Sequence, residues 1–237
     1  MIIPGALYMI PTEIAADTTA AVLPPRIREA VEGINAFAVE DLRSARRFIK
    51  RVVPAKVIDG VQFFEIGKHG EQKEDPTAII SLLRQGEAVG VLSEAGCPGV
   101  ADPGSVVAAA AQRAGIRVVP LVGPSSLLLA LMASGLNGQC FAFKGYLPTR
   151  KPELKEHLRT MEERIHRLAE AQIFIETPFR NNQLLGEVVR SCKGSTLLCI
   201  AQDISGAGEY IHTHPVEYWR THLPQLAKLP TVFILGC

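Results

Sequence analysis

The fold of this 237-residue chain is decided by the segment Ser93-Glu94-Ala95-Gly96-Cys97-Pro98-Gly99-Val100-Ala101-Asp102-Pro103-Gly104. It follows a short apolar run, 88–92, and precedes an alanine-rich helical pattern, 105–114. A loop between a strand and a helix is where open α/β sheets bind ligands. Its three glycines let the backbone approach a ligand, and its two carboxylates can accept hydrogen bonds from hydroxyl or amino groups. Alternatively, the segment is a simple connection in which Asp102 caps the next helix.

Short apolar runs alternate with helical patterns on both sides of this segment, which predicts an α/β fold. In the first part we expect strands at 6–10, 36–39, 88–92 and 116–121, and helices at 24–35, 42–52, 75–85, 105–114 and 125–133. Farther along we expect helices at 153–171 and 181–192, and strands at 172–176, 196–201, 209–212 and 231–235. The polar segment 145–152 contains two prolines, and it predicts a boundary between an N-terminal domain, residues 1–144, and a C-terminal domain, residues 145–237.

The composition is that of an ordinary globular protein, with 47% hydrophobic and 21% charged residues. A net charge of +1 excludes a surface that is basic throughout, so any nucleic-acid contact has to be local. Five scattered cysteines without a CxxC pair indicate reduced thiols and no metal site. Because no signal peptide or membrane-spanning stretch is recognisable, we expect a cytoplasmic protein with no membrane association.

The helix expected at 42–52 is densely basic. Its basic side chains are Arg43, Arg46, Arg47, Lys50 and Arg51, and helical spacing puts all of them except Arg46 on roughly one side. A solvated surface is one interpretation of such a run. The other is a patch that contacts RNA phosphates, which an RNA substrate requires and a small molecule does not.

Several segments together resemble the tetrapyrrole-methylase superfamily, and within it the ribosomal RNA small-subunit methyltransferase I family. That family has a segment of the form SDAGTPxISDPG, which is similar to residues 93–104, and one of the form AGIxVxPLPGPSA, which is similar to residues 114–126. Its AEDTRxTRRLL resembles residues 39–49, its FxGFLP resembles 143–148, and its ESPHR resembles 176–180. These blocks follow the family order from residue 7 to about residue 180.

The resemblance implies two α/β domains of the tetrapyrrole-methylase type, with S-adenosylmethionine bound in the cleft between them, in a homodimer that needs no metal. It implies a methyltransferase that modifies a ribose 2′-hydroxyl of ribosomal RNA, free or in the small ribosomal subunit. The residues that would surround the cofactor by this resemblance are Pro11, Glu94, Ala95, Gly96, Val100, Ala101, Asp102, Ser125, Ser126, Glu176, Thr177, Pro230 and Thr231.

Two segments depart from the family pattern. The family's first loop reads TPIGNLxDI, whereas residues 10–17 here read IPTEIAAD and lack the glycine-asparagine pair. The family's ELTKxHE segment is replaced by DISGAGE at 203–209. Both changes concern substrate recognition, so two alternatives stay open: methylation of a tetrapyrrole or another small molecule, and a non-catalytic protein that binds S-adenosylmethionine.

A ribose hydroxyl is a poor nucleophile until its proton is removed or shared, so methyl transfer predicts a base. The candidates are Glu40 and Asp41, at the end of the second expected strand, and His69, near a histidine-bearing segment of the family. Each has a structural alternative. Glu40 or Asp41 could cap the helix that follows, and His69 could be a solvated loop residue.

Overall fold

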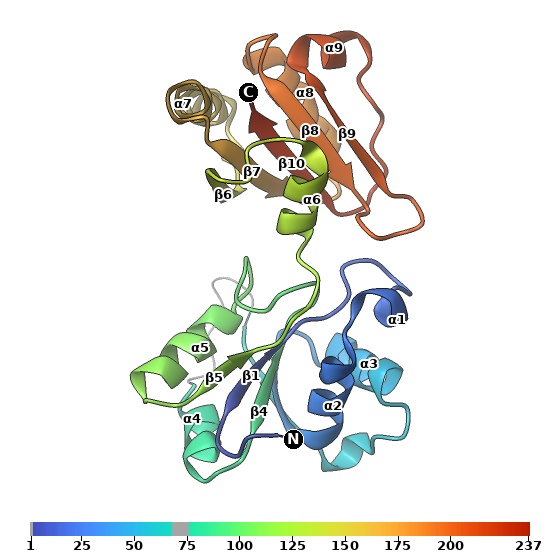
Figure 1. The fold of residues 1–237 in the computed structure, drawn as a ribbon, viewed down its shortest axis with the longest axis vertical. Helices are drawn as coiled ribbons and strands as arrows, with labels where there is room; N and C mark the ends of the chain where they lie inside the picture. The colour runs from blue at the N-terminus through green and yellow to red at the C-terminus, as the bar shows by residue number, and fades with distance from the viewer. Residues whose placement is uncertain (1, 68–75) are drawn as a thin grey trace. The chain divides into compact units, whose positions relative to one another are not determined.

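The computed structural model describes residues 2–67 and 76–237 of the chain. Two compact units, Met1–Ser125 and Ser126–Cys237, make up the fold, and each is described by itself. The predicted boundary after Lys144 is wrong, because this residue lies inside strand β6 (Phe141–Tyr146), which pairs with β7 (Ala171–Glu176) in the second unit. Both units alternate strands and helices, so the predicted α/β fold is confirmed (Figure 1).

The first unit is built on a five-stranded sheet in the order β3-β2-β4-β1-β5. Its strands are β1 (Leu7–Ile10), β2 (Ala36–Val39), β3 (Gln62–Glu65), β4 (Val89–Leu92) and β5 (Val118–Pro120). All four pairings are parallel, so the carboxyl ends of the strands lie along one edge of the sheet. The loops after β1, β2, β4 and β5 therefore leave the sheet on the same side.

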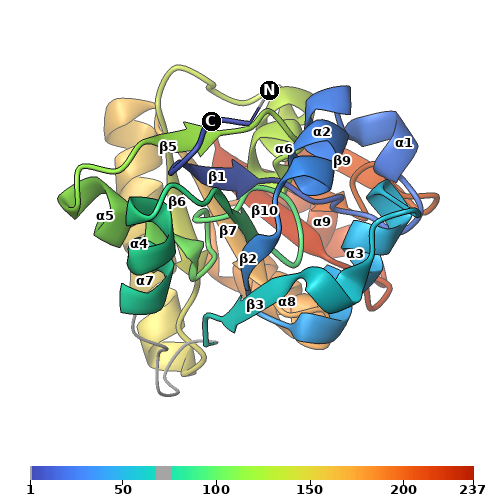
Figure 2. The ribbon, with the colours of Figure 1, turned by 90° about the horizontal axis from the view of Figure 1, so that it is seen from below.

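Helices cover both faces of this sheet because successive side chains of a strand point to opposite faces. Tyr8 and Ile10 pack with α2 (Pro25–Gly33) and α3 (Leu42–Val52). Leu7 and Met9 pack with α4 (Thr77–Arg84) and α5 (Gly104–Arg113) on the other face (Figure 2). The short α1 (Thr19–Val22) and the 3₁₀ turn Ile58–Gly60 lie in the connections.

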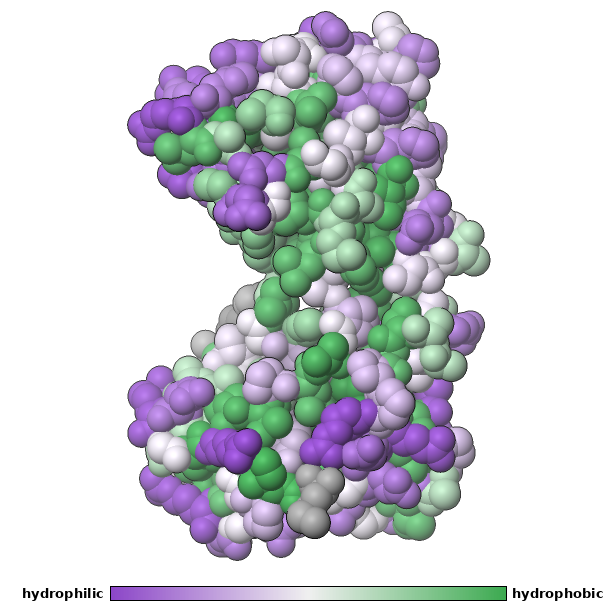
Figure 3. All heavy atoms as spheres, in the orientation of Figure 1, coloured by the Kyte–Doolittle hydropathy of each residue, from purple (hydrophilic) through white to green (hydrophobic). Residues whose placement is uncertain are grey.

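The second unit has a mixed sheet in the order β6-β7-β10-β8-β9. Its other strands are β8 (Leu197–Gln202), β9 (Tyr210–Pro215) and β10 (Thr231–Gly236). One face is covered by α7 (Lys151–Leu168), α8 (Asn181–Ser191) and α9 (Val216–Thr221), which bury Phe174, Trp219 and Phe233. The other face packs against α6 (Ser126–Ser134). The surface over α7 is mainly hydrophilic (Figure 3). None of the described helices is long and apolar enough to cross a bilayer.

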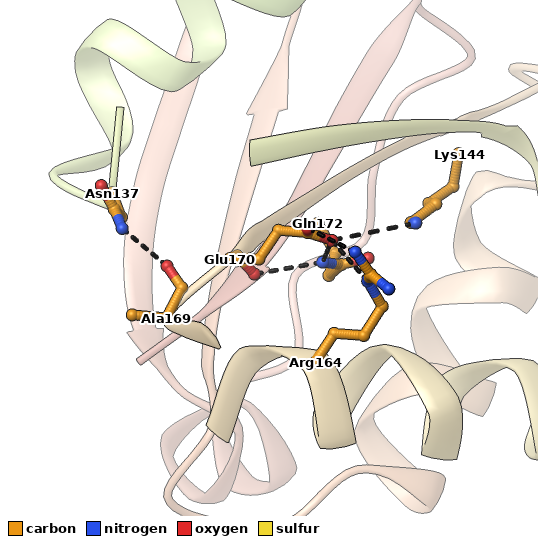
Figure 4. Close-up of polar contacts among 6 residues, drawn as sticks. All are labelled: Asn137, Lys144, Arg164, Ala169, Glu170 and Gln172. Carbon is orange, nitrogen blue, oxygen red and sulfur yellow. Dashed lines mark hydrogen bonds and ion pairs between the residues drawn. The ribbon is translucent and has the colours of Figure 1, made fainter. Parts of the chain in front are cut away.

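A polar cluster joins the end of α7 to the start of β7 (Figure 4). The Arg164 guanidinium donates to both carboxylate oxygens of Glu170, from Nε to Oε1 and from Nη2 to Oε2, each at 2.7 Å. Gln172 Nε2 donates to Glu170 Oε1 at 2.6 Å. The Arg164 hydrogen bonds, followed by that of Gln172, lower the pKa of Glu170 to about 2. The carboxylate is therefore charged and well partnered although its side chain is buried.

Candidate functional site

Three loops meet at the carboxyl edge of the parallel sheet. The Thr12 amide, after β1, donates to the Gly96 carbonyl oxygen at 3.0 Å, and Ser93 Oγ donates to the same oxygen at 2.5 Å. Cys97 Sγ donates to the Pro124 carbonyl oxygen at 3.3 Å, which joins the loop after β4 to the loop after β5. Burial raises the pKa of the Cys97 thiol, so it stays a protonated donor. The structure thus places the sequence-predicted segments around Pro11, Gly96 and Ser125 side by side.

Close packing at these loops leaves no room for larger residues. A Cβ on Gly123 would lie 2.2 Å from Pro11 Cβ, so glycine is required there. Gly96 and Gly99 adopt positive φ angles of 76° and 80°. Ala101 also has a positive φ, of 56°, a conformation that non-glycine residues adopt rarely. The backbone is therefore held in an unusual path, as expected where main-chain groups contact a ligand.

Asp102 holds the 93–104 loop together. Its Oδ1 accepts hydrogen bonds from the Gly99 amide at 2.9 Å and from the Gly104 amide, the first residue of α5, at 2.7 Å. These hydrogen bonds support the alternative that Asp102 stabilises the loop and the start of the next helix. A contact between Asp102 and the cofactor stays a prediction. The side chains that this loop exposes are those of Glu94, Ala95, Val100 and Ala101, which were all predicted to contact the cofactor.

A pocket of about 200 Å³ lies beside these loops in the first unit. It is lined by the loop after β1, one side of α3 and the end of β4 with the residues that follow it: Thr12, Glu13, Ser44, Ala45, Arg47, Phe48, Arg51, Leu92, Ser93 and Glu94. Glu13 forms an ion pair with Arg51, and its side chain is only 11% exposed. Its second oxygen, Oε2, is buried and has no hydrogen-bond partner among the described residues. Thr12, Glu13 and Ser93 were not among the predicted site residues, although Thr12 and Glu13 closely follow β1 and Ser93 directly follows β4.

The predicted bases have different surroundings. Asp41 Oδ1 accepts a hydrogen bond from the Ser44 amide at 2.7 Å, so Asp41 caps α3 as the structural alternative proposed. Glu40 lies beside it at the end of β2 and is half-buried. His69 lies outside the described residues. A catalytic role for any of the three stays a prediction.

The basic side chains of α3 divide into two groups. Lys50 Nζ donates to the carbonyl oxygens of Pro54 and Lys56 at 2.6 and 3.1 Å, and Arg46 lies 5.4 Å from the Phe63 ring centroid. These two, with the ion-paired Arg51, stabilise the fold. Arg43 and Arg47 are exposed and have no ion pair or hydrogen bond with any described residue. Arg43 and Arg47 are therefore the two cations of the predicted RNA-binding set that have no side-chain partner among the described residues, and they are the best placed for an external anion.

A second cluster of predicted residues lies in the second unit. Glu176, at the end of β7, and Thr231, at the start of β10, are paired in the sheet. Thr231 Oγ1 accepts hydrogen bonds from Asn181 Nδ2 at 2.9 Å and Gln202 Nε2 at 3.0 Å. Asn181 is fully buried, and its Oδ1 has no hydrogen-bond partner in residues 2–67 and 76–237. Sequence reasoning missed Asn181 and Gln202, although Asn181 directly follows the 176–180 motif.

The remaining predicted residues of this unit are Ser126, Thr177 and Pro230. Glu176 Oε1 accepts from the Thr177 amide at 2.7 Å, and Pro230 accepts from the Asp203 amide at 2.9 Å. Ser126 begins α6. The predicted cofactor cleft between the two domains stays a prediction.

Comparison with known proteins gives a consistent picture. No family model matches the chain. The chain is 30% identical over 215 residues to ribosomal RNA small subunit methyltransferase I of Escherichia coli O157:H7, an alignment that covers 90% of this chain and 70% of that protein. It is 31% identical over 219 residues to the protein of the same name from Mesorhizobium japonicum, with coverage of 92% and 69%.

Solved structures share the fold. The crystal structure of the methyltransferase CobJ matches with a TM-score of 0.63 at 18% identity, over 98% of this chain and 94% of that one. Uroporphyrin-III C-methyltransferase from Thermus thermophilus, crystallised with S-adenyl homocysteine, matches with a TM-score of 0.55 at 17% identity, over 98% and 97%. The predicted tetrapyrrole-methylase fold is thereby confirmed. From the sequence identities, their coverage and this fold, we conclude that the chain belongs to the ribosomal RNA small subunit methyltransferase I family.

Proposed function

We propose that this methyltransferase transfers a methyl group from S-adenosylmethionine to a ribose 2′-hydroxyl of small-subunit ribosomal RNA. The proposal rests on the family and on one observation of the structure, the pocket where Glu13 and Arg47 lie beside the 93–104 loop. An anion such as a phosphate would contact Arg47, and a hydroxyl could donate to a carboxylate. Because methyl transfer requires in-line alignment of the acceptor, a pocket that fixes a ribose would supply much of the rate enhancement.

The residues present fit S-adenosylmethionine, which when bound would supply an electrophilic methyl group on a sulfonium. The glycine-containing 93–104 loop offers main-chain groups at close approach, and the exposed Glu94 can accept hydrogen bonds from ribose hydroxyls. The buried Oδ1 of Asn181, which has no partner in the described part of the chain, is suited to accept a hydrogen bond from an amino group. We propose that the 93–104 loop contacts the cofactor in the first unit, and we propose Asn181, Glu176 and Thr177 as cofactor contacts of the second unit.

We further propose that the protein acts as a homodimer in the cytoplasm, where ribosomal subunits are assembled. The helix α6 is apolar, and its side chains Leu128 and Met132 are 51% and 78% exposed. Exposed apolar side chains that lie together mark surfaces that bind another protein, and we propose that a second copy of the chain covers them. Sedimentation velocity at micromolar concentration measures the oligomeric state. A monomer throughout that range would remove the homodimer from the proposal and leave the chemistry untouched.

The function is tested by calorimetric titration with S-adenosylmethionine, followed by transfer of radiolabelled methyl groups to small ribosomal subunits that lack modifications. The proposal predicts binding and label in the RNA. Binding without transfer to RNA would favour a small-molecule acceptor such as a tetrapyrrole or a non-catalytic role. Absence of binding would contradict the proposal.

A further inference from the structure

An exposed aromatic ring lies at the edge of the second sheet where predicted cofactor contacts gather. Strand β10 runs antiparallel to β7, so the end of β7 at Glu176 and the start of β10 at Thr231 lie at the same edge (Figure 1). Phe179, in the loop after β7, is 79% exposed. Lys228, in the loop before β10, places its ammonium nitrogen 5.2 Å from the centroid of the Phe179 ring. We call Phe179 and Lys228 the edge pair.

The two loops that carry the edge pair are joined by hydrogen bonds. Asn182 Nδ2 donates to the Leu226 carbonyl oxygen at 2.9 Å, and the Leu226 amide donates back to Asn182 Oδ1 at 2.8 Å. Asn181 Nδ2 donates to the Leu229 carbonyl oxygen at 3.0 Å. These bonds hold the loop before β10 against the start of α8. A ligand would therefore meet backbone that is already ordered, which lowers the entropic cost of binding.

Both members of the edge pair are available to a ligand. No aromatic ring of the described residues stacks on Phe179, and its high exposure leaves the ring face opposite Lys228 open to solvent. Lys228 has no ion pair or side-chain hydrogen bond with any described residue. The carboxylate at this edge is already partnered, because Glu176 Oε2 lies 3.2 Å from Arg180 Nη2 and Oε1 accepts from the Thr177 amide at 2.7 Å.

The chemistry of the edge pair fits a nucleotide of single-stranded RNA. Unpaired bases stack on exposed aromatic rings, and a neighbouring lysine can contact the phosphate of the same strand. The charge of Lys228 argues against two other occupants. It would repel the sulfonium of S-adenosylmethionine, and lysine is depleted at the centre of protein interfaces.

We propose that Phe179 stacks on a base of the substrate RNA and that Lys228 contacts a phosphate beside it. This inference rests on the proposed function, because it names the contact through which the second unit holds the RNA. Phe179 follows Thr177, a proposed cofactor contact, by two positions in the same loop, so the RNA is held close to the methyl donor. The contact is separate from that of Arg43 and Arg47, which lie in the first unit.

The ring is tested by fluorescence anisotropy of the full-length protein with a fluorescein-labelled twelve-nucleotide single-stranded RNA of mixed sequence. Phe179→Leu removes the ring but keeps an apolar side chain, whereas Phe179→Trp keeps a ring and is the matched control. Loss of one stacked base predicts affinity about 5- to 150-fold weaker for Phe179→Leu and near wild-type affinity for Phe179→Trp. The salt dependence of Phe179→Leu should equal that of wild type, because no phosphate contact is removed.

The lysine is tested by the same titration at several salt concentrations. Lys228→Gln should flatten the slope of log affinity against log salt by about 0.7, the value for one phosphate contact of a single strand. Lys193→Gln, an exposed lysine just beyond the opposite end of α8, is the control and should leave the slope unchanged. Calorimetric titration with S-adenosylmethionine should give wild-type affinity for every variant, because the edge pair contacts the RNA and not the cofactor.

Wild-type RNA affinity of Phe179→Leu, or a wild type that does not bind the RNA, would overturn the inference. An equal loss of S-adenosylmethionine affinity in Phe179→Leu would also overturn it, since the ring would then contact the cofactor. So would a variant that changes only the oligomeric state in sedimentation, since the edge pair would then be an interface between copies.

The inference and the proposed function fail in different ways. If the wild type methylates unmodified small subunits while Phe179→Leu binds RNA normally, the edge-pair inference fails and the proposed function stands. If RNA binding depends on Phe179 but the wild type methylates no RNA, the proposed function fails and the RNA contact stands.

Discussion

Glu13 and Arg51 form an ion pair that joins the loop after β1 to helix α3 at the wall of the pocket. The Glu13 side chain is almost completely buried, whereas Arg51 is 42% exposed. Removing one partner of a buried ion pair leaves the other as an uncompensated buried charge, which destabilises the fold. Both residues line the pocket, so their ion pair holds the loop after β1 against α3. This loop is the one whose sequence departs from the family pattern.

Arg51→Gln should lower the free energy of unfolding by about 1–3 kcal/mol, because it leaves the Glu13 carboxylate buried without its partner. Urea unfolding followed by far-UV circular dichroism measures the change. Arg43→Gln, an exposed position on the same helix, is the control and should stay within about 0.5 kcal/mol of wild type. Adding Glu13→Gln to Arg51→Gln should restore most of the loss. Equal effects at Arg51 and Arg43 would show that the ion pair contributes nothing.

Asp102→Ala removes the acceptor of two amide hydrogen bonds in the 93–104 loop. We expect about 1–2 kcal/mol lower stability and roughly tenfold weaker binding of S-adenosylmethionine, because the loop loses its fixed path. Thermal unfolding and calorimetric titration measure the two effects. Asp59→Ala, an exposed carboxylate of the same unit, should change neither. If Asp102→Ala binds S-adenosylmethionine with wild-type affinity, the 93–104 loop does not contribute to cofactor binding.

Glu170 makes the stability of the second unit depend on pH in the acid range. Its pKa is held at about 2, mainly by the Arg164 hydrogen bonds, below the ordinary value of 4.5. The stabilisation is therefore complete above pH 4.5 and is lost as the pH falls toward 2. Urea unfolding followed by the fluorescence of Trp219, the only tryptophan, reports this unit. The difference between wild type and Glu170→Gln should be constant from pH 7 to 5 and shrink below pH 4.5. A difference that does not change with pH would contradict this assignment.

Arg43 and Arg47 should account for the salt dependence of RNA binding by α3. Replacing both by glutamine should flatten the slope of log affinity against log salt by about 0.7–0.9 for each lost phosphate contact. Filter binding at several salt concentrations measures it, with Arg113→Gln on α5 as the control. Lys50→Gln should instead destabilise the protein, because Lys50 holds the carbonyl oxygens after α3. An unchanged slope in the double variant would remove α3 from the RNA contact.

The sequence predicted most elements because their patterns are local. The strands at 36–39 and 231–235 and the helix at 42–52 are found within a residue of the expected bounds. Strand β6 was missed, and the domain boundary misplaced, because Lys144 and Gly145 interrupt an edge strand with no fully buried residue. Strand β3 was also missed, because it lies at the edge of its sheet and has no fully buried residue.

The candidate site was predicted only where residues form a contiguous motif. The 93–104 loop and Pro11 were recognisable, and the structure brings their backbones together. The ion pair of Glu13 with Arg51, and the contacts of Asn181 and Gln202 with Thr231, join residues 29 or more positions apart along the chain.

The chemical position of the methyl group tests the central claim most directly. Radiolabelled S-adenosylmethionine and unmodified small ribosomal subunits are incubated with the enzyme, and the purified RNA is hydrolysed in alkali. A 2′-O-methyl group blocks cleavage at its nucleotide, so we predict that the label elutes in an alkali-resistant dinucleotide. Label in mononucleotides would place the methyl group on a base and contradict ribose methylation. RNA without label, from an enzyme that binds the cofactor, would contradict the RNA acceptor itself.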